Sequence, residues 1–349
     1  MLLTIPYPAW LSPEIFTIPG LGLAVRWYSL GYIIAFTIAF LLYRVQIRER
    51  RFPMSEDDLN SLFLCGILSL ILGARLFSAM VYDQSNEFWL RPWLAFWPFR
   101  NGVFTGFLGM SYHGGVIGGV LAIIIWSAVK RYDYRETGDM FAASIPLGYT
   151  FGRLGNFANA ELYGRVTTGP WGMIFPGAAE FPASEAWVQD VAAQTGTAIV
   201  GATVNLPRHP SQLYEAFLEG ILLWLIIWFF RNRKPFKGFL SGLYIAGYGV
   251  FRFLVEYVRE PDAHIGFVFE FGERGLPTAL AHPLLSFSTG QVLSSGMIAI
   301  GLLWILIASK LPNNKSVLVY LDSNRPKAPT EAEKKTAQKS RRKLRKKLR

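Results

Sequence analysis

Cysteine, histidine and charge are all scarce in this chain. Cys65 is the only cysteine among 349 residues, so we expect no intramolecular disulfide and no cysteine-based metal site. The four histidines form no HExxH pattern and no i, i+4 pair, which leaves a zinc site unsupported. We therefore expect no metal and no cofactor. Because Cys65 falls in the middle of an apolar run, we interpret it as a small packing residue.

Apolar residues make up the balance. The chain is 52% hydrophobic and only 17% charged, which is typical of a polytopic membrane protein. A membrane-spanning helix needs roughly 20 mostly apolar residues. We predict an all-α polytopic membrane protein with seven transmembrane helices, at about 27–43, 59–82, 112–129, 139–159, 211–230, 238–258 and 287–309. The opening stretch, MLLTIPYPAWLSPEIF, has no basic region and no small-residue cleavage site, so we do not interpret it as a signal peptide.

The basic residues predict the orientation. Segments 44–51, 130–135, 231–237 and the tail from 310 hold 25 of the 35 lysines and arginines. Because cytoplasmic loops carry the excess of Lys and Arg, we expect the N-terminus outside the cytoplasm and the C-terminus inside. Most of the +11 net charge comes from this tail, which we interpret as a disordered cytoplasmic segment rather than a nucleic-acid site. Adhesion to anionic lipid heads is the alternative for the tail.

Two outer segments differ from the spans. Residues 87–102, EFWLRPWLAFWPFRNG, mix aromatic residues with arginine and proline, which favours an arm lying in the lipid headgroup region. Residues 165–207 are polar, with short β-like pieces such as TAIVGATVNL, and predict a small extracytoplasmic subdomain. We thus expect a transmembrane domain at 1–309, including both segments, followed by the tail at 310–349.

Costly polar groups recur at one predicted depth, near the outer ends of several spans. An ionisable residue inside a span costs at least about 2.5 kcal/mol and by default marks a functional site. Snorkelling to the headgroups explains the position of any single arginine nearly as well. It explains a set of polar residues at one depth less well. The set comprises Tyr28, Arg75, His113, Arg153, Asn156, Asn159, Tyr248, Arg252 and Glu256.

Spacing places several of these groups on shared helix faces. Tyr248, Arg252, Glu256 and Arg259 follow one another at i, i+4, i+8 and i+11. A polar cavity with more guanidinium than carboxylate charge suits a phosphate, because forked donors bind its oxygens in pairs. The glycines of HGGVIGG, at 113–119, permit close approach of a ligand or, more often, of another helix. A phosphate reached from the membrane implies a phospholipid headgroup.

One long motif resembles a known family signature. GRLGNFANAELYG, at 152–164, is similar to the G-R-x-G-N-F-x-N-x-E-x-x-G signature of bacterial prolipoprotein diacylglyceryl transferases. The resemblance continues, in family order, in RWYSLGY, GMSYHGGVIGG, RHPSQLYE and FRFLVEYVREPD. Ala158 departs from the bulkier aliphatic residue of the family, and residues 165–207 and the basic tail match poorly.

The resemblance implies a transferase of the bacterial inner membrane that acts in lipoprotein biosynthesis. Such an enzyme moves the diacylglyceryl group of phosphatidylglycerol to the thiol of a lipobox cysteine in a preprolipoprotein, and glycerol phosphate is released. The expected catalytic residues are His113, Arg153 and Arg252. The expected substrate-binding residues are Tyr28, Arg75, Asn156, Asn159, Glu161, Gly164, Tyr248, Glu256 and Arg259.

Physical chemistry divides these roles further. Arginines suit the growing charge of a departing phosphate, and a thiol with a pKa near about 8.5 needs a proton acceptor. Our hypothesis is that His113 takes this proton and that Glu256 orients Arg252, although His113 also suits a purely pocket-shaping role. Gly164 is expected to permit the turn into the subdomain. A lipid or anion transporter is the alternative function, disfavoured by the lack of internal repeats, and a non-catalytic lipid-binding scaffold is a third.

Overall fold

The computed structural model describes most of the chain up to residue 314. The described residues are 4–19, 23–50, 52–82, 87–97, 99–100, 103–104, 109–260, 267–269, 277, 279–280, 283 and 286–314. The predicted disordered tail therefore lies almost wholly outside them.

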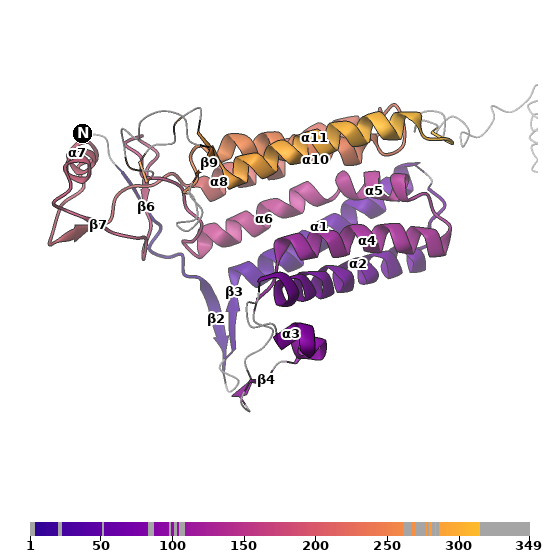
Figure 1. Cartoon of the computed structure of the whole chain (residues 1–349), viewed down its shortest axis with the longest axis horizontal. Coiled ribbons are helices and arrows are strands. Elements are labelled where there is room, and N and C mark those ends of the chain that lie inside the picture. Colours follow the sequence, from indigo (N-terminus) through magenta and orange to yellow (C-terminus); the bar gives the residue numbers. More distant parts are fainter. Residues whose placement is uncertain are drawn as a thin grey trace, which may run out of the picture.

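Long apolar helices form the body of the protein (Figure 1). In the described part of the chain, five of them are long and apolar enough to cross a membrane: Trp27–Arg50, Glu56–Tyr82, Tyr112–Lys130, Ser211–Phe230 and Thr289–Lys310. Their outward faces carry large exposed side chains such as Leu68, Leu121 and Leu303. A bundle with an apolar outer surface is stable only against lipid, so the chain is a multi-pass membrane protein. Cys65 also faces outward instead of packing inside, contrary to our interpretation.

Three of these five helices are regular and two contain π-helical turns. The regular ones are α1 (Trp27–Arg50), α4 (Tyr112–Lys130) and α11 (Thr289–Lys310). The second span is α2 (Glu56–Phe77) continued by the π segment η1 (Ser78–Tyr82). The helix Ser211–Phe230, the fifth of the seven predicted spans, consists of α8 (Ser211–Glu215), the π segment η3 (Ala216–Leu222) and α9 (Leu223–Phe230).

The predicted span at 139–159 is instead two helices. They are α5 (Tyr134–Ala142) and α6 (Ile145–Ala158). Pro146 lies in the first turn of α6, where its missing N–H costs nothing, but its ring prevents continuation from the preceding helix. Another short apolar helix, α10 (Phe239–Val255), follows the fifth span and packs along α11. It ends three residues before the predicted boundary at 258.

Glycines bring α2 and α4 into close contact. A Cβ atom at Gly114 would overlap the carbonyl oxygen of Gly73, and one at Gly118 would overlap that of Ser69. These glycines of HGGVIGG therefore serve helix packing, the more common of the two predicted uses.

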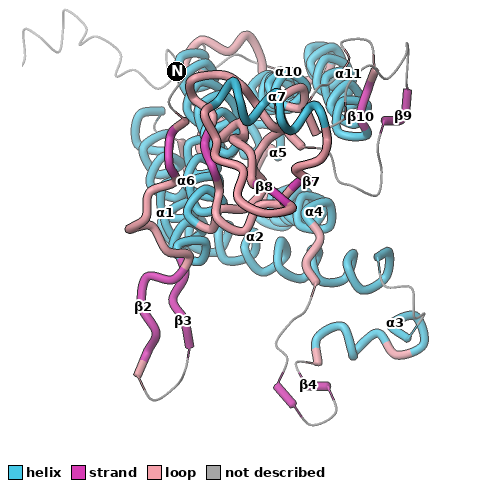
Figure 2. Tube along the Cα trace, turned by 90° about the vertical axis from the view of Figure 1, so that its left-hand side faces the viewer, coloured by secondary structure: helices cyan, strands magenta, loops and turns pink. Residues whose placement is uncertain are grey.

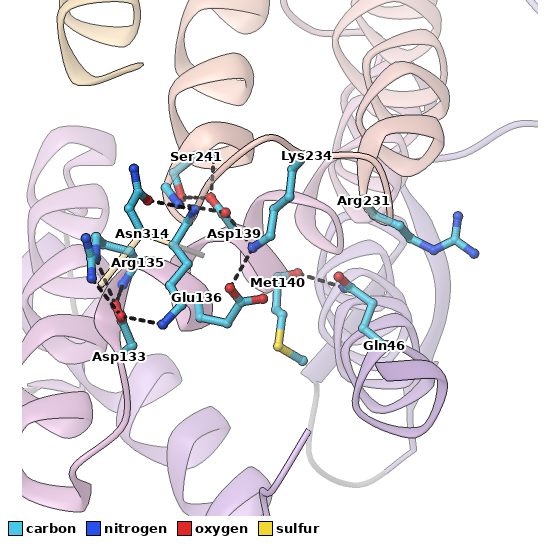
Figure 3. Close-up of polar contacts among 12 residues, drawn as sticks. Gln46, Asp133, Arg135, Glu136, Asp139, Met140, Arg231, Lys234, Ser241 and Asn314 are labelled. Atoms are coloured by element: carbon cyan, nitrogen blue, oxygen red, sulfur yellow. Dashed lines mark hydrogen bonds and ion pairs between the residues drawn. The ribbon is translucent and has the colours of Figure 1, made fainter. Parts of the chain in front are cut away.

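The predicted basic segments meet at one end of the bundle. Arg50 binds Glu136 (Nη1–Oε1, 2.9 Å) and donates from Nη2 to the carbonyl oxygen of Arg231 (2.8 Å). Arg135 donates to the carbonyl oxygen of Pro312 at 3.1 Å, which brings in the chain after α11. Figure 3 shows the centre of this cluster, where Lys234 lies between Glu136 and Asp139, 2.8 Å from each carboxylate.

Asp139 also holds the start of α10. Its carboxylate accepts the backbone N–H groups of Gly238 and Ser241 at 2.8 and 2.9 Å. The aspartate thereby satisfies donors that would otherwise be orphaned at a helix N-terminus. Because α10 carries Arg252, this contact at one end helps to fix the helix that reaches the site at the other.

The segment at 165–207, for which we predicted a subdomain, lies at the opposite end of the bundle (Figure 1). Its core is formed by Val166, Val188, Val191, Ala192, Val204 and Leu206. It contains β6 (Met173–Ile174), paired in parallel with the N-terminal β1 (Ile5–Pro6), and β7 (Phe181–Pro182), paired with β8 (Thr203–Val204). Within TAIVGATVNL only β8 is extended, and the helix α7 (Ala186–Thr195) was not predicted.

Two further pieces extend from one side of the bundle (Figure 2). One is the hairpin of β2 (Glu14–Ile18) and β3 (Leu23–Arg26). The other contains the segment at 87–102, for which we predicted an arm, with α3 (Glu87–Leu90), the 3-10 turn η2 (Pro92–Phe96) and β4 (Phe99–Arg100), followed by β5 (Val103–Phe104). A last pair, β9 (Phe267–Phe269) with β10 (Phe287–Ser288), precedes α11.

Candidate active site

Three arginines converge on one buried carboxylate at the subdomain end of the bundle. Glu215, the last residue of α8, has a side chain only 1% exposed. Its Oε2 lies 2.7 Å from Nε of Arg153 on α6. Its Oε1 lies 3.3 Å from Nη1 of Arg252 on α10 and 3.8 Å from Nη1 of Arg259. Helices that are far apart in sequence thus meet at this carboxylate.

The first predicted wall, around Arg153, is a connected set of polar groups. Arg153 donates from Nε to the Tyr149 hydroxyl (2.6 Å) and from Nη1 to Oδ1 of Asn156 (3.4 Å). Asn156 and Asn159 both donate to Oε1 of Glu161, at 2.8 and 3.2 Å. Ala160 and Leu162, the residues on either side of Glu161, have φ angles of 52° and 56°, uncommon for residues other than glycine. Such backbone strain is typical of functional sites.

The second predicted wall runs along α10. Arg252 Nη2 binds Oε2 of Glu256 at 2.8 Å, as the i, i+4 spacing predicted. Glu256 also accepts from the Ser288 hydroxyl (3.0 Å), which caps α11, so α11 supports this pair. Tyr248 packs edge-on against Tyr149, with ring centroids 5.9 Å apart. Arg259 lies beyond the end of α10 and reaches Glu215 from the following turn.

Two glutamates in the fifth span belong to the site although we did not single them out. Glu215 is the last residue of the motif RHPSQLYE, to which we assigned no role beyond the family resemblance. Glu219 lies one turn later in η3, where its Oε2 accepts from the Tyr149 hydroxyl at 2.5 Å. The signal that could have identified both was a pair of carboxylates inside an otherwise apolar span.

These glutamates correct the predicted charge balance. Arg153, Arg252 and Arg259 face Glu215, Glu219 and Glu256, so among the described residues guanidinium charge does not exceed carboxylate charge.

His113 and Arg75 have other surroundings. Among the described residues, His113 contacts the Tyr82 hydroxyl (3.1 Å from Nδ1) and the rings of Phe77 and Tyr112, rather than an arginine. Arg75 is buried and holds the arm, because it donates to the carbonyl oxygens of Ala95 (2.5 Å) and Gly109 (3.0 Å). The sequence motifs gave no means of separating these two from the arginine cluster.

Tyr28 and Gly164 lie beside the site through backbone packing. The Tyr28 backbone packs on Gly155, where an added Cβ would come within 3.1 Å of the Tyr28 Cα, and its hydroxyl pairs with that of Tyr32 (2.9 Å). A Cβ at Gly164 would overlap the carbonyl oxygen of Val258. Glycine is therefore needed at 164 for the close approach of two chain segments, and its φ angle is not positive.

This arrangement places three guanidinium groups around one anionic group, the Glu215 carboxylate. The guanidinium groups come from α6 and from α10 with its following turn, so their positions are set by helix packing rather than by a loop. In the described part of the chain, no group of three or more His, Cys, Asp or Glu side chains could hold a metal ion.

Comparison with known proteins identifies the family. The family model for prolipoprotein diacylglyceryl transferase matches residues 13–307. The chain belongs to the prolipoprotein diacylglyceryl transferase family. Proteins named phosphatidylglycerol–prolipoprotein diacylglyceryl transferase are similar to it over most of their length. The Treponema denticola protein is 51% identical over 88% of this chain and 95% of its own, and the Treponema pallidum protein 48% over 86% and 94%. The Borrelia garinii protein is 39% identical over 89% and 95%.

The family match covers every element of the arginine site. As in the rest of the prolipoprotein diacylglyceryl transferase family, this chain is an enzyme that transfers a diacylglyceryl group. Three motifs that are separate in the sequence, at 152–164, 208–215 and 251–262, supply Arg153, Glu215 and Arg252 respectively. Both arginines contact Glu215.

Proposed function

We propose that this protein transfers the diacylglyceryl group of phosphatidylglycerol to the thiol of the lipobox cysteine in preprolipoproteins. The observation that carries the proposal is the convergence of Arg153 and Arg252, from two helices, on the two oxygens of the Glu215 carboxylate, at 2.7 and 3.3 Å. A phosphate at that point would receive donors from both sides. The names of the similar Treponema and Borrelia proteins support the same substrates.

The proposed step is a substitution at carbon. The thiol sulfur forms a bond to the glyceryl carbon, the C–O bond to the phosphate breaks, and glycerol phosphate leaves with the electron pair. Arg153 and Arg252 stabilise the charge that grows on the leaving phosphate, and they need no reorganisation because other partners already hold them. The attacking thiol belongs to the substrate, so the enzyme needs no cysteine of its own.

His113 remains our proposed acceptor of the thiol proton. It is exposed at the start of α4, while the adjacent Tyr112 interacts with Tyr248 at the edge of the arginine site. A lipobox thiol that reaches the site past the start of α4 would pass His113 first. Histidine is suited to this role because its ordinary pKa lies near neutrality.

The remaining predicted residues have supporting roles in this proposal. Asn156, Asn159 and Glu161 bind the headgroup or orient Arg153, Tyr28 and Tyr248 line the site, and Gly164 allows the subdomain to pack closely. Glu256 orients Arg252, Arg259 adds positive charge, and Arg75 acts indirectly by holding the arm.

We also propose a topology for the chain. Seven membrane crossings would be formed by the five long helices together with α6 and α10. The N-terminus and the subdomain, at about 165–207, would lie outside the cytoplasm of a bacterial inner membrane, with the arm, at about 87–102, in the outer headgroup region. The transmembrane domain would end near 309 and the tail at 310–349 would be cytoplasmic. The meeting of the basic segments at one end of the bundle supports this orientation.

The direct test uses purified protein, phosphatidylglycerol and a lipobox peptide, with mass analysis of the peptide cysteine. Transfer predicts a diacylglyceryl increment on that cysteine. Movement of lipid between leaflets without an adduct would instead show a transporter. If neither an adduct nor lipid movement were detected, the protein would be a lipid-binding scaffold.

A further inference from the structure

Glu215 occupies the place that the proposed function assigns to a phosphate. We propose that Glu215 is an exchangeable counter-ion, which holds the arginines between turnovers and is displaced when the phosphodiester of phosphatidylglycerol binds. This inference rests on the proposed function and adds a means of substrate entry and product release to it.

The chemistry of the two anions is matched. A carboxylate and a phosphodiester each carry one negative charge and present two equivalent oxygens. In Glu215 one oxygen faces Arg153 and the other faces Arg252 and Arg259. Two unesterified phosphate oxygens can take the same two sets of donors, because guanidinium groups bind both kinds of anion through paired contacts.

The site requires an anion at all times. The side chains of the three arginines are only 15 to 16% exposed. Guanidinium groups stay charged, and like charges brought together away from water repel strongly unless an anion lies between them. A carboxylate from the protein can supply that anion whenever lipid is absent.

Glu215 is held loosely enough to be exchanged. Its contacts with Arg252 and Arg259 are long, at 3.3 and 3.8 Å. Its Oε2 lies near Arg153 but accepts no directed hydrogen bond from any residue that the structure describes, because the Nε–H of Arg153 is directed at the Tyr149 hydroxyl. Glu215 is also the residue at which α8 passes into the π segment η3, a feature often found at functional sites.

The arginines would keep their positions after Glu215 leaves. Arg153 is still bound by Tyr149 and Asn156, and Arg252 by Glu256, which Ser288 holds in turn. The exchange therefore moves one side chain and leaves the donors in place for the incoming phosphate.

The same competition would favour release of the product. When the C–O bond breaks, the phosphate keeps the electron pair and the thiol proton passes to the proton acceptor. The leaving monoester then carries more negative charge than the bound diester and would be held more tightly. The returning Glu215 carboxylate competes for the same guanidinium donors and therefore speeds the dissociation of glycerol phosphate.

The test is glycerol 1-phosphate binding by the full-length protein, measured calorimetrically for the wild type and Glu215→Gln. Loss of the competing charge is expected to tighten binding by at least about fivefold, the lower end of typical coupling between ligands. The KM for phosphatidylglycerol in the transfer assay should fall as well, and kcat should fall because product leaves slowly. Binding that is unchanged or weaker in Glu215→Gln would overturn the proposal, since a purely structural role predicts weaker binding.

Two further variants complete the test. Glu215→Asp retains the charge but retracts it, so it should tighten binding by a smaller factor and can be judged alone if Glu215→Gln fails to fold. Glu136→Gln removes a buried carboxylate that also binds two cations, Arg50 and Lys234, at the other end of the bundle, and should leave binding unchanged. If the wild type forms no thioether, the proposed function fails, while the binding comparison still reports separately on Glu215.

Discussion

At the scale of single residues, Tyr149 connects the two sides of the site. Its hydroxyl accepts a hydrogen bond from Arg153 and donates one to Glu219, and its ring lies under the Arg153 guanidinium, 4.9 Å from centroid to Cζ. Hydrogen bonds to charged groups contribute about 1.5 to 3 kcal/mol each. Tyr149 should therefore hold the direction of the Arg153 side chain.

Replacing Tyr149 by Phe removes the hydroxyl and keeps the ring. We expect kcat for transfer to fall by about tenfold or more, because the guanidinium loses part of its fixed geometry, while KM changes little. Tyr43→Phe removes another buried hydroxyl, in the core near the basic end, and should keep the wild-type kcat. A Tyr149→Phe enzyme with wild-type kcat would show that Arg153 is positioned without this bond.

At the scale of elements, the loop before α8 joins the subdomain to the site. His209 accepts a hydrogen bond at Nδ1 from Trp171 (3.2 Å), and its backbone pairs with Gly164 and Arg165. Burial lowers the pKa of His209 to about 4. Protonation would both charge a partly buried ring and remove the acceptor that Trp171 uses.

This depressed pKa predicts an acid-sensitive subdomain contact. The folded-state pKa lies below the ordinary value of 6.5, so the stability that neutral His209 contributes is complete above pH 6.5 and is lost as pH falls toward 4. We expect the melting temperature of the wild type to fall between pH 7 and pH 5 by more than that of His209→Gln. Parallel decreases in the two proteins would assign the acid sensitivity to other groups.

Several elements could be predicted from sequence, and the exceptions have physical causes. Hydropathy identified the five long helices, because lipid-facing surfaces need apolar side chains all along the span. The break between α5 and α6 was not visible in hydropathy, since it depends on Pro146, whose ring a continuous helix cannot accommodate. TAIVGATVNL has β-forming residues, yet only β8 finds a partner strand.

At the scale of the whole molecule, charge is divided between the two ends of the bundle. One end gathers basic segments into ion pairs with Glu136, Asp133 and Asp139, and the other gathers Arg153, Arg252 and Arg259 around Glu215. The sequence predicted which segments share an end, because the positive-inside rule acts on whole loops. It could not predict the pairing of β1 with β6, since contacts between residues so distant in the chain leave no local pattern.

The site was likewise predictable only where the residues in contact leave a local sequence pattern. Arg153, Arg252 and Glu256 could be predicted because depth and helical spacing place them together. The central position of Glu215 among the arginines depends on how α8 packs between α6 and α10, which is a tertiary property.

The central claim is that Arg153 and Arg252 act on the departing phosphate, and the most direct measurement is the rate of thioether formation by Arg153→Ala and Arg252→Ala. Each substitution should lower the rate by about a hundredfold to a thousandfold while the protein still folds and inserts into the membrane. Arg44→Ala, which breaks an exposed ion pair with Glu56, is the matched control and should transfer at the wild-type rate. A wild-type rate in either Arg153→Ala or Arg252→Ala would contradict the account.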